Sequence, residues 1–277
     1  MRIKYRARKV YNAEVLLDTL RARPDVAGTV RSIKFGTPYF YREETENHAA
    51  IIWLCRNLVA LDLCGWNGFA RAPLVEAVRS AHTLKSICIN HLGISDADSE
   101  GDAFCSGLEL LRMMRVWPGI EEVVIHVSAL SAEFYNDSTE VPESDSNRES
   151  DDEPGSTHAE WKEERRVLAE GRQFDQTTDW SNATPCLRYM QFNRVSDSLD
   201  NTFLGRLATM APNLQCFHAD IASRAFDGLR LCLHAWRHSL RTLHILYYYD
   251  RSIMHHGPPG TDCWRKQKFA FLGYPTD

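Results

Sequence analysis

His234 and His238 are the side chains whose spacing could bind a metal ion. We expect them on one helix, where imidazoles four residues apart share a face and can grip zinc. Ala235 follows His234, whereas a zinc protease needs a glutamate there as its general base. A second group, which includes His255 and Cys263, lies in a Gly/Pro-rich segment that is typical of a surface loop. We therefore predict no metal site in either segment.

Ser146 and Ser150 are candidates for phosphorylation by an acid-directed kinase. Glu149 and Glu153 stand three positions after them, and a phosphate would add about 1.5 to 2 negative charges at each serine. The alternative is a solvated loop without regulation. Elsewhere the sequence contains no nucleophile elbow, phosphate-binding glycine loop, dinucleotide fingerprint or EF-hand loop. We predict no catalytic residue and no cofactor.

The cysteines and the hydropathy indicate a cellular compartment. The eight cysteines form no Cys-x-x-Cys pair, and most lie in apolar segments, where a reduced thiol behaves as a small apolar side chain. The basic first ten residues are not followed by the apolar stretch of a secretory signal. No apolar run reaches the roughly 18 residues that cross a bilayer. These features predict free thiols, an intracellular location (cytoplasmic or nuclear) and no membrane partner.

Negative charge is concentrated in one segment. The net charge is −5, but residues 133–160 contain ten acidic residues and one basic residue, Arg148. That segment carries −9, so the remainder carries +4, the difference between −5 and −9. A nearly neutral remainder argues against nucleic acid as a partner, because nucleic-acid-binding modules present strongly basic faces. Few apolar residues occur in the segment, and we predict that it is a disordered insertion.

An internal repeat is the strongest organising signal. The pattern apolar-x-x-apolar-x-apolar occurs seven times, and its copies begin at Val30, Leu58, Leu84, Ile120, Leu187, Leu214 and Leu240. Four of the intervals are 28, 26, 27 and 26 residues, whereas the other two are 36 and 67. Leucine-rich repeats run about 20 to 29 residues and contain one strand and one helix or turn each. The period therefore predicts seven strands that stack in one common phase.

The segment before each strand predicts an amphipathic helix. The inward positions are Leu74, Val75, Val78 and Ala81; Phe104, Leu108, Leu111 and Met114; Phe203, Leu204, Leu207 and Met210; Phe226, Leu229, Leu233 and Trp236. A further helix is expected near residues 12–21, and Asp200 and Ser223 are expected N-caps of the last two helices. The predicted fold is α/β, a leucine-rich-repeat-like solenoid or horseshoe arc with parallel strands on the concave side and helices on the convex side. The alternative is a doubly wound α/β domain, which also alternates helix and strand.

These elements divide the chain into three parts. Residues 1–132 are expected to form the N-terminal repeats of one solenoid, residues 133–160 the acidic disordered insertion, and residues 161–277 the C-terminal repeats with an irregular end. Within the last part, a helix is expected around residues 161–173, and Tyr247, Tyr248 and Tyr249 are expected to continue the last strand or cap the solenoid.

Alternate side chains of the predicted strands would line the concave surface. This row is mixed and mildly polar, which suits a protein partner better than a phosphate backbone. The alternative is a solvated sheet face, with binding elsewhere on the molecule. The candidate partner-binding residues are Lys34, Asp62, Asn90, Glu122, His126, Tyr189, Gln191, Asn193, His218, Asp220 and His244.

The segments between helix and strand carry a family resemblance. They read Cys-Arg-Asn-Leu at 55–58, Ala-His-Thr-Leu at 81–84, Thr-Pro-Cys-Leu at 184–187 and Ala-Pro-Asn-Leu at 211–214. Together with residues 20–33, they resemble the irregular leucine-rich-repeat regions of fungal F-box-type proteins. In that family an F-box docks on an adaptor of a cullin ubiquitin ligase, and the repeats select the substrate. The resemblance covers the repeats; no F-box is found before the first repeat.

The expected function is non-enzymatic recognition of a protein, with a substrate receptor of a ubiquitin ligase as its most specific form. A cullin-ligase adaptor would be a second partner if the full protein has an F-box. Two alternatives remain open. One is a repeat scaffold or inhibitor without a ligase link, and the other is an α/β enzyme of unrecognised type.

Overall fold

The computed structural model describes residues 2–4, 12–35, 42–64, 71–90, 104–126, 130–131, 179–195, 199–222, 225–248 and 266–272. Two compact units divide the chain, one comprising Met1–Glu133 with Ser181–Asp277 and the other Phe134–Trp180. Every helix and strand reported below belongs to the first unit. The acidic segment 133–160 and the helix expected at 161–173 lie outside the described residues.

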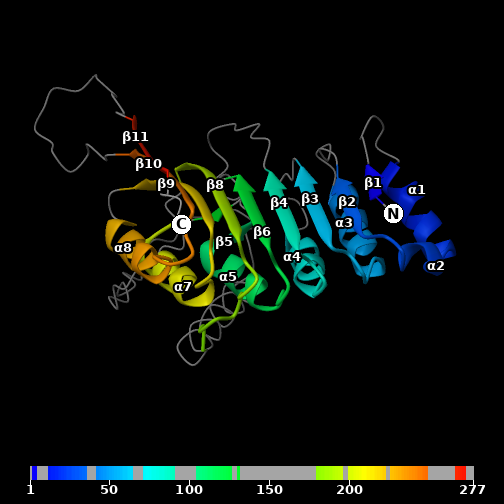
Figure 1. The fold of residues 1–277 in the computed structure, drawn as a ribbon. Coiled ribbons are helices and arrows are strands. Elements are labelled where there is room, and N and C mark those ends of the chain that lie inside the picture. The colour runs from blue at the N-terminus through cyan, green and yellow to red at the C-terminus, as the bar shows by residue number, and fades with distance from the viewer. Residues whose placement is uncertain are drawn as a thin grey trace, which may run out of the picture. The chain divides into compact units, whose positions relative to one another are not determined.

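The described part of the first unit alternates helices with strands (Figure 1). The helices are α1 (Asn12–Ala22), α2 (Pro24–Ala27), α3 (Arg42–Leu54), α4 (Arg71–Ser80), α5 (Gly107–Arg115), α7 (Asn201–Met210) and α8 (Phe226–Ala235). The strands are β1 (Arg2–Lys4), β2 (Ser32–Phe35), β3 (Ala60–Cys64), β4 (Ser86–Asn90), β5 (Cys105–Ser106), β6 (Glu122–His126), β7 (Leu130–Ser131), β8 (Tyr189–Val195), β9 (Cys216–Ala222), β10 (Thr242–Tyr248) and β11 (Lys266–Leu272).

Nine of these strands form one sheet in the order β1-β2-β3-β4-β6-β8-β9-β10-β11. All neighbours pair in parallel except β11, which is antiparallel to β10. The predicted α/β class with a parallel sheet is therefore correct. The doubly wound alternative is wrong, because such folds reverse their strand order at a switch point and this order does not reverse.

The seven strands of the repeated pattern lie in the predicted phase. Their first residues form one continuous row across the sheet: Ser32, Ala60, Ser86, Glu122, Tyr189, Cys216 and Thr242. The second apolar position of each copy is buried in the first six strands, from Ile33 in β2 to Phe217 in β9. In β10 the equivalent Leu243 is half-buried, and its neighbour Ile245 is buried. A constant period thus gives a constant register.

One face of the sheet is covered by the helices (Figure 1). Crossovers between parallel strands are right-handed in nearly all proteins, so a strand order without reversal places successive helices on the same face. The inward positions predicted for α5 and α7 are all buried. In α4 three of the four are buried, and Val75 is half-buried. The covered face is therefore the core of this unit.

Helix α8 differs from its prediction. Leu229 and Trp236 are buried as expected, but Phe226 is 53 % exposed. The reason is Gly228, where an added Cβ would lie 2.8 Å from both Asn201 Cα and Leu204 Cβ of α7. This close approach turns Ala225, Gly228 and Cys232 inward, so the buried stripe is rotated away from Phe226.

Of the two N-cap residues predicted from the sequence, one is confirmed. Asp200 caps α7, because its Oδ1 accepts a hydrogen bond from the Phe203 N–H at 2.7 Å. The predicted cap Ser223 is wrong, since α8 begins at Phe226 after Ala225 and has no side-chain cap. A capping box at the start of α5 was not predicted: Ser106 Oγ accepts from the Glu109 N–H, and Glu109 Oε2 accepts from the Ser106 N–H.

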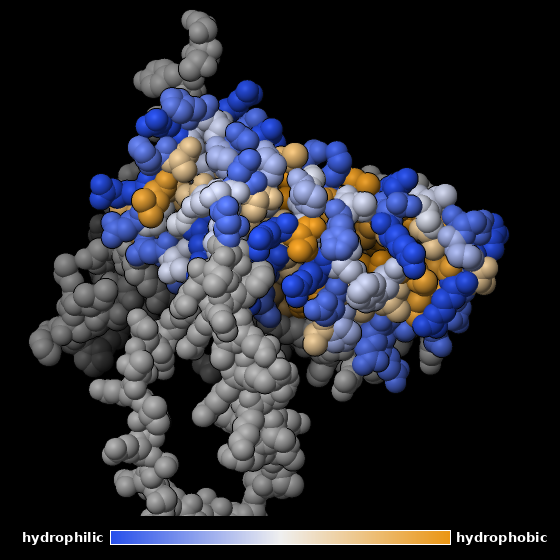
Figure 2. All heavy atoms as spheres, turned by 90° about the horizontal axis from the view of Figure 1, so that it is seen from below, coloured by the Kyte–Doolittle hydropathy of each residue, from blue (hydrophilic) through white to orange (hydrophobic). Residues whose placement is uncertain are grey.

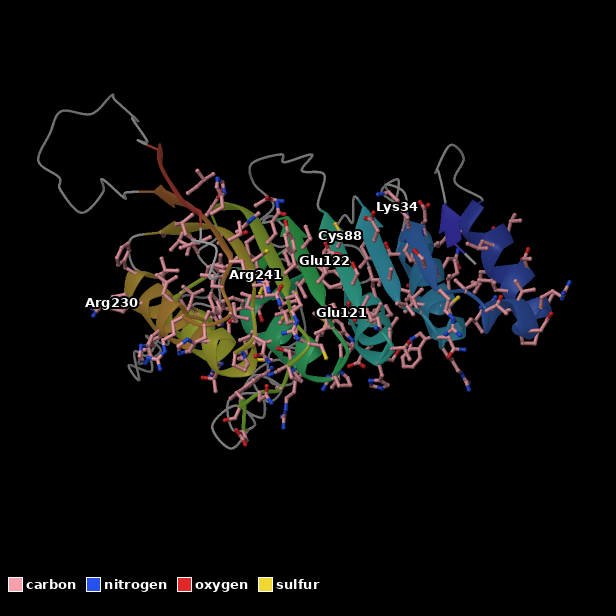
Figure 3. All side chains as sticks on the ribbon, in the orientation of Figure 1. Lys34, Cys88, Glu121, Glu122, Arg230 and Arg241 are labelled. Atoms are coloured by element: carbon pink, nitrogen blue, oxygen red, sulfur yellow. The ribbon has the colours of Figure 1, made fainter. Side chains whose placement is uncertain are left out.

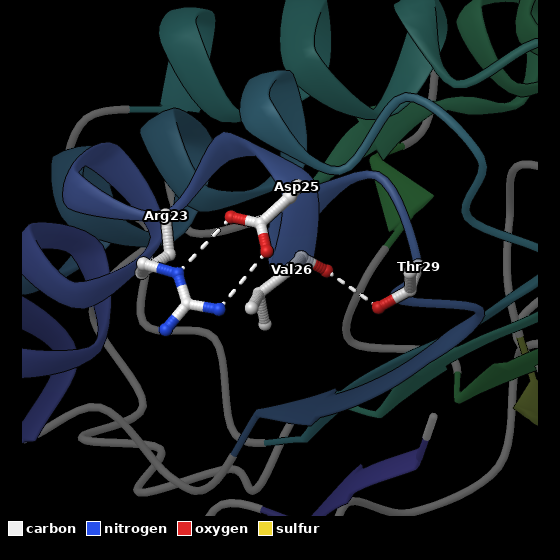
Figure 4. A network of polar contacts seen from close by, with 4 residues as sticks. All are labelled: Arg23, Asp25, Val26 and Thr29. Carbon is white, nitrogen blue, oxygen red and sulfur yellow. Dashed lines mark hydrogen bonds and ion pairs between the residues drawn. The ribbon is translucent and has the colours of Figure 1, made fainter.

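The turns from helix to strand repeat the same hydrogen bonds. The first apolar residue of each pattern donates its N–H to the carbonyl three residues earlier in six copies, from Val30 to Leu214. In the seventh copy Leu240 donates to Trp236, one residue further back. At the first turn, Thr29 Oγ1 also donates to Val26 O at 2.8 Å, and Arg23 forms two hydrogen bonds with Asp25 (Figure 4). The repeated segments therefore encode one repeated turn.

A second set of hydrogen bonds joins each turn to the preceding one. In each case a polar side chain just before the apolar pattern donates to a main-chain carbonyl of the unit before it. These bonds are Asn57 Nδ2 to Gly28 O (2.8 Å), Thr83 Oγ1 to Leu58 O (2.7 Å), Asn213 Nδ2 to Pro185 O (3.2 Å) and Ser239 Oγ to Pro212 O (3.1 Å). We call them the turn ladder. Cys186 and Gly119 occupy the equivalent positions in the two remaining units.

The ends of the sheet were only partly expected. The basic start of the chain contributes β1, which pairs with β2. Strand β10 runs to Tyr248, as predicted for the tyrosine run. The segment beyond it was expected to be irregular, and this is wrong for Lys266–Leu272, which folds back as β11 along the whole of β10.

Candidate functional site

The sheet face opposite the helices is the candidate site. We call it the open face, because no helix of the described residues covers it. It consists of alternate, at least partly exposed side chains of β2 to β10: Ser32, Lys34, Ala60, Asp62, Ser86, Cys88, Glu122, Val124, Tyr189, Gln191, Asn193, Cys216, His218, Thr242 and His244. Eight of the eleven predicted binding residues are in this set.

The N-terminal part of the open face, on β2 to β6, is organised by charge (Figure 3). Lys34 and Asp62 are register partners on β2 and β3, and the Lys34 Nζ forms an ion pair with Asp62 Oδ2. On β4 and β6, Ser86 Oγ donates to Glu122 Oε2 at 2.9 Å. Each charged group here is bonded to a side chain on the neighbouring strand. These bonds order the charged side chains but occupy some of their hydrogen-bond donors and acceptors.

The C-terminal part, on β8 to β10, is organised by aromatic and amide groups. Tyr189 Oη donates to Gln191 Oε1, and Gln191 Nε2 donates to Asn193 Oδ1 at 2.6 Å. The Tyr189 ring meets His218 edge-on with centroids 5.5 Å apart, and His218 meets His244 in the same way at 5.6 Å. These five side chains form a row across three strands, which we call the aromatic row.

Burial shifts the pKa values of two side chains of the aromatic row. Burial, and then the neighbouring His244, lower the pKa of His218 below its usual value of 6.5. Burial raises the pKa of Tyr189, and the nearby Glu122 adds to this effect. His218 Nε2 is buried and has no hydrogen-bond partner among the described residues. An aromatic surface with an unused polar atom can be desolvated at low cost and can still form a specific hydrogen bond.

Asp220 does not belong to the open face, which corrects the prediction. It is only 7 % exposed. The register between β8 and β9 shifts: Gln191 pairs with His218, but Val195, not Asn193, pairs with Asp220. Extra residues in β8 therefore separate Asn193 from Asp220, and the predicted third row is broken at this point.

Four predicted residues cannot be placed by their side chains. Asn90 and His126 end β4 and β6, and their side chains lie outside the described residues. The candidate phosphorylation sites Ser146 and Ser150 also lie outside them.

The histidine pair considered for zinc is not arranged as expected. Helix α8 ends at Ala235, so His234 and His238 do not share one helix face. His238 Nε2 lies 2.9 Å from Arg237 Nε, which donates to it. No group of three or more potential ligands that could hold a metal occurs in the part of the chain that the structure describes.

The described cysteines are free, as predicted. Burial raises the pKa of Cys55 to about 11 and also raises the pKa of Cys232. Cys232 Sγ donates to Leu204 O at 3.1 Å in the contact between α7 and α8. These two thiols are packing groups, because a nucleophilic cysteine needs a lowered pKa.

One set of mostly polar residues was missed by the sequence analysis. The residue after the first apolar position of each pattern lies just before each strand: Arg31, Val59, Lys85, Glu121, Arg188, Gln215 and Arg241. Each main-chain N–H donates to the carbonyl of the preceding member at 2.7 to 2.9 Å. We call this the edge row. The signal was available, since four of seven equivalent positions are basic.

The surface is mainly hydrophilic where the strands begin. Seen from below, polar side chains predominate, and apolar ones are visible in separate places between them (Figure 2). No helix in the described ranges has both the length and the apolar character needed to cross a bilayer. No protein-family model matches this chain, and no curated protein matches its sequence.

Proposed function

We propose that this chain is a non-enzymatic recognition module of the leucine-rich-repeat type, and that it binds a protein partner on the open face. The observation that carries the proposal is the common register of seven neighbouring parallel strands, with one face that no helix of the described residues covers. At a spacing of about 4.8 Å, seven strands span roughly 29 Å. That width accommodates a helix or an extended segment of another protein.

The composition of the open face supports a protein partner. Its C-terminal part contains a tyrosine, two histidines and two amides that are already held by hydrogen bonds and ring contacts. Side chains fixed before binding lose little conformational entropy on association. Tyrosine is enriched among the residues that dominate binding energy in protein interfaces. The aromatic row is therefore the proposed centre of the interface.

Site-specific photo-cross-linking tests this proposal. A photoreactive amino acid replaces Gln191 on the open face in one variant and His234, an exposed residue of α8, in the matched control. Irradiation in cell extract, followed by mass spectrometry, should yield a protein adduct from position 191 and not from position 234. Adducts from position 234 alone would place binding on the helices and contradict the proposal.

The more specific form of the proposal is a substrate receptor of a cullin ubiquitin ligase. The resemblance of the turn segments to F-box-type repeats supports it, and the turn ladder gives Asn57 and Asn213 in these segments a stacking role. Affinity purification of the full-length protein should recover a cullin adaptor. If a partner binds the open face but no adaptor is recovered, a scaffold or inhibitor is the better interpretation.

A further inference from the structure

At the end that borders the aromatic row, the edge row contains two arginines, Arg188 and Arg241. Each has side-chain hydrogen-bond donors that no described residue accepts from. Arg188 and Arg241 are exposed and flank Gln215. They lie two strands apart, so their Cα atoms are separated by roughly 10 Å. They directly precede Tyr189 on β8 and Thr242 on β10.

Elsewhere in the edge row, a cation pairs with the carboxylate of its neighbour. Lys85 Nζ donates to Glu121 Oε1 at 2.8 Å, across one strand spacing. The hydrogen bond and the charge of Glu121 raise the pKa of Lys85. Lys34 and Asp62 form a similar pair on the open face. Two cations in the N-terminal part of the sheet, Lys85 and Lys34, are therefore neutralised by carboxylates of neighbouring strands.

Arg188 is held in place, but no carboxylate of the described residues pairs with it. Its Nη1 donates to Asn213 O at 3.1 Å and to Pro185 O at 3.4 Å. The Nε and Nη2 donors form no hydrogen bond with described residues, and these two atoms are the edge that binds a carboxylate through two parallel hydrogen bonds. Arg31 makes the equivalent bond to Asn57 O at 3.1 Å, so this anchoring belongs to the repeat.

Arg241 has no equivalent anchor. The strand that pairs with β10 on this side, β11, is antiparallel, so no described turn supplies the equivalent carbonyl. The Arg241 side chain forms no hydrogen bond or ion pair within the described ranges. Glu122, the nearest acidic group of the open face, already accepts from Ser86. Among the described residues, the C-terminal end of the sheet thus presents two arginines without a carboxylate partner beside the aromatic row.

We propose that this end of the open face binds an acidic segment of the partner protein. Two carboxylates of that segment bind Arg188 and Arg241, and the part of the segment between these carboxylates contacts the aromatic row. The inference rests on the proposed function and adds the chemistry of the partner. Two carboxylates roughly 7 to 10 Å apart, as in acidic residues separated by one or two others in an extended chain, match the two guanidinium groups.

The test measures binding of a fluorescein-labelled peptide of alternating glutamate and serine to the full chain by fluorescence anisotropy. The neutral control peptide has glutamine in place of glutamate. We expect the acidic peptide to bind at least about tenfold more tightly at low salt, and the difference to shrink as salt screens the charges. Arg241→Gln and the Arg188→Gln/Arg241→Gln double variant should weaken acidic-peptide binding progressively.

Two matched variants separate a local site from general charge attraction. Arg31→Gln removes an edge-row arginine with the same anchoring bond, and Arg230→Gln removes an exposed arginine of α8; neither should change binding. Since the Arg241 side chain forms no hydrogen bond or ion pair with described residues, Arg241→Gln removes charge without loss of such a bond. Circular dichroism then confirms that any loss of binding is not unfolding.

Three outcomes overturn the inference. One is equal binding of the two peptides, and another is equal loss in Arg31→Gln and Arg241→Gln. The third is tighter binding of duplex DNA through the same arginines, which would indicate a nucleic-acid surface. An open-face adduct from position 191 with any of these results leaves the proposed function standing and removes only the acidic partner.

Discussion

The two faces of the sheet are built from the same strands but differ in almost every physical property. On the covered face, side chains such as Ile33, Val123 and Phe217 are at most 1 % exposed and belong to the apolar core. On the open face, most of the alternate residues are polar, all are at least partly exposed, and several are hydrogen-bonded to one another. The comparison indicates that stability and recognition are separated by side-chain alternation alone, so substitutions one residue apart should have different consequences.

The largest difference is expected from Leu214→Asp. Leu214 is fully buried at the start of the pattern before β9, and an unpaired charge there should lower the free energy of unfolding by about 4 kcal/mol or more. The control is Gln215→Asp, one residue further along in the edge row between two arginines, with a change below about 1 kcal/mol. Denaturant unfolding measures both, and similar losses would contradict the separation of the two faces.

Helix packing on the covered face is tested by a pair of glycines. Gly228→Ala should destabilise by roughly 2 to 3 kcal/mol, because the new Cβ would lie 2.8 Å from the α7 backbone. Gly205→Ala in α7 meets only Leu231 Cδ1, at 3.7 Å, and should stabilise by about 0.5 to 1 kcal/mol through helix propensity. Thermal unfolding of the two variants should therefore shift in opposite directions. A shift in the same direction would refute the close approach of α7 and α8.

The two faces also differ in how they respond to acid. His48 of α3 is buried, stacks on Phe35 at 4.1 Å, and has its pKa lowered by burial from 6.5 to about 4. His48 therefore takes up a proton near pH 6.5 in the unfolded chain and only near pH 4 in the folded chain. Its contribution to the free energy of unfolding is complete above pH 6.5 and is lost as the pH falls towards 4.

The measurement is the free energy of unfolding of the natural chain and of His48→Leu as a function of pH. The natural chain should lose about 2 kcal/mol more than the variant between about pH 6.5 and 5. His218→Ala on the open face should change this pH dependence much less, because His218 is only partly buried. Parallel pH curves for the natural chain and His48→Leu would show that His48 does not titrate as its burial implies.

A smaller effect is expected at the turn ladder. Asn213→Ala removes the hydrogen bond from Asn213 Nδ2 to Pro185 O at 3.2 Å. The side chain is exposed, so we expect a loss of about 1 kcal/mol and faster local opening of β8 and β9. Amide hydrogen exchange measures that opening; unchanged protection in both strands would mean that the ladder bond does not hold neighbouring units together.

The sequence was sufficient for features that repeat and insufficient for features that occur once. The seven strands and their phase follow from a fixed interval between apolar residues, because each unit packs on the next in the same way. A helix was expected before each strand, but no inward positions could be assigned to α3, since its buried side includes Glu44, Thr45 and His48, which hide the apolar periodicity. Strand β11 carries no copy of the pattern and reverses direction, so no period could indicate it.

The candidate site was predicted to the same extent. Alternation placed Lys34, Gln191 and His218 correctly on one face, because this depends only on strand geometry. Asp220 was misplaced because β8 has more residues than β9 between the pairs Gln191–His218 and Val195–Asp220. The apolar pattern does not show this difference. The hydrogen bonds of the aromatic row and the free edge of Arg188 depend on side-chain conformation, which a sequence pattern does not specify.

The most direct test of the open face as the binding surface uses His218→Ala, with the partner identified by cross-linking. The substitution removes a half-exposed side chain whose Nε2 has no hydrogen-bond partner among the described residues. The free energy of unfolding should therefore change by less than about 1 kcal/mol, while the dissociation constant of the partner should rise at least about tenfold. An unchanged dissociation constant in the correctly folded variant would contradict the account.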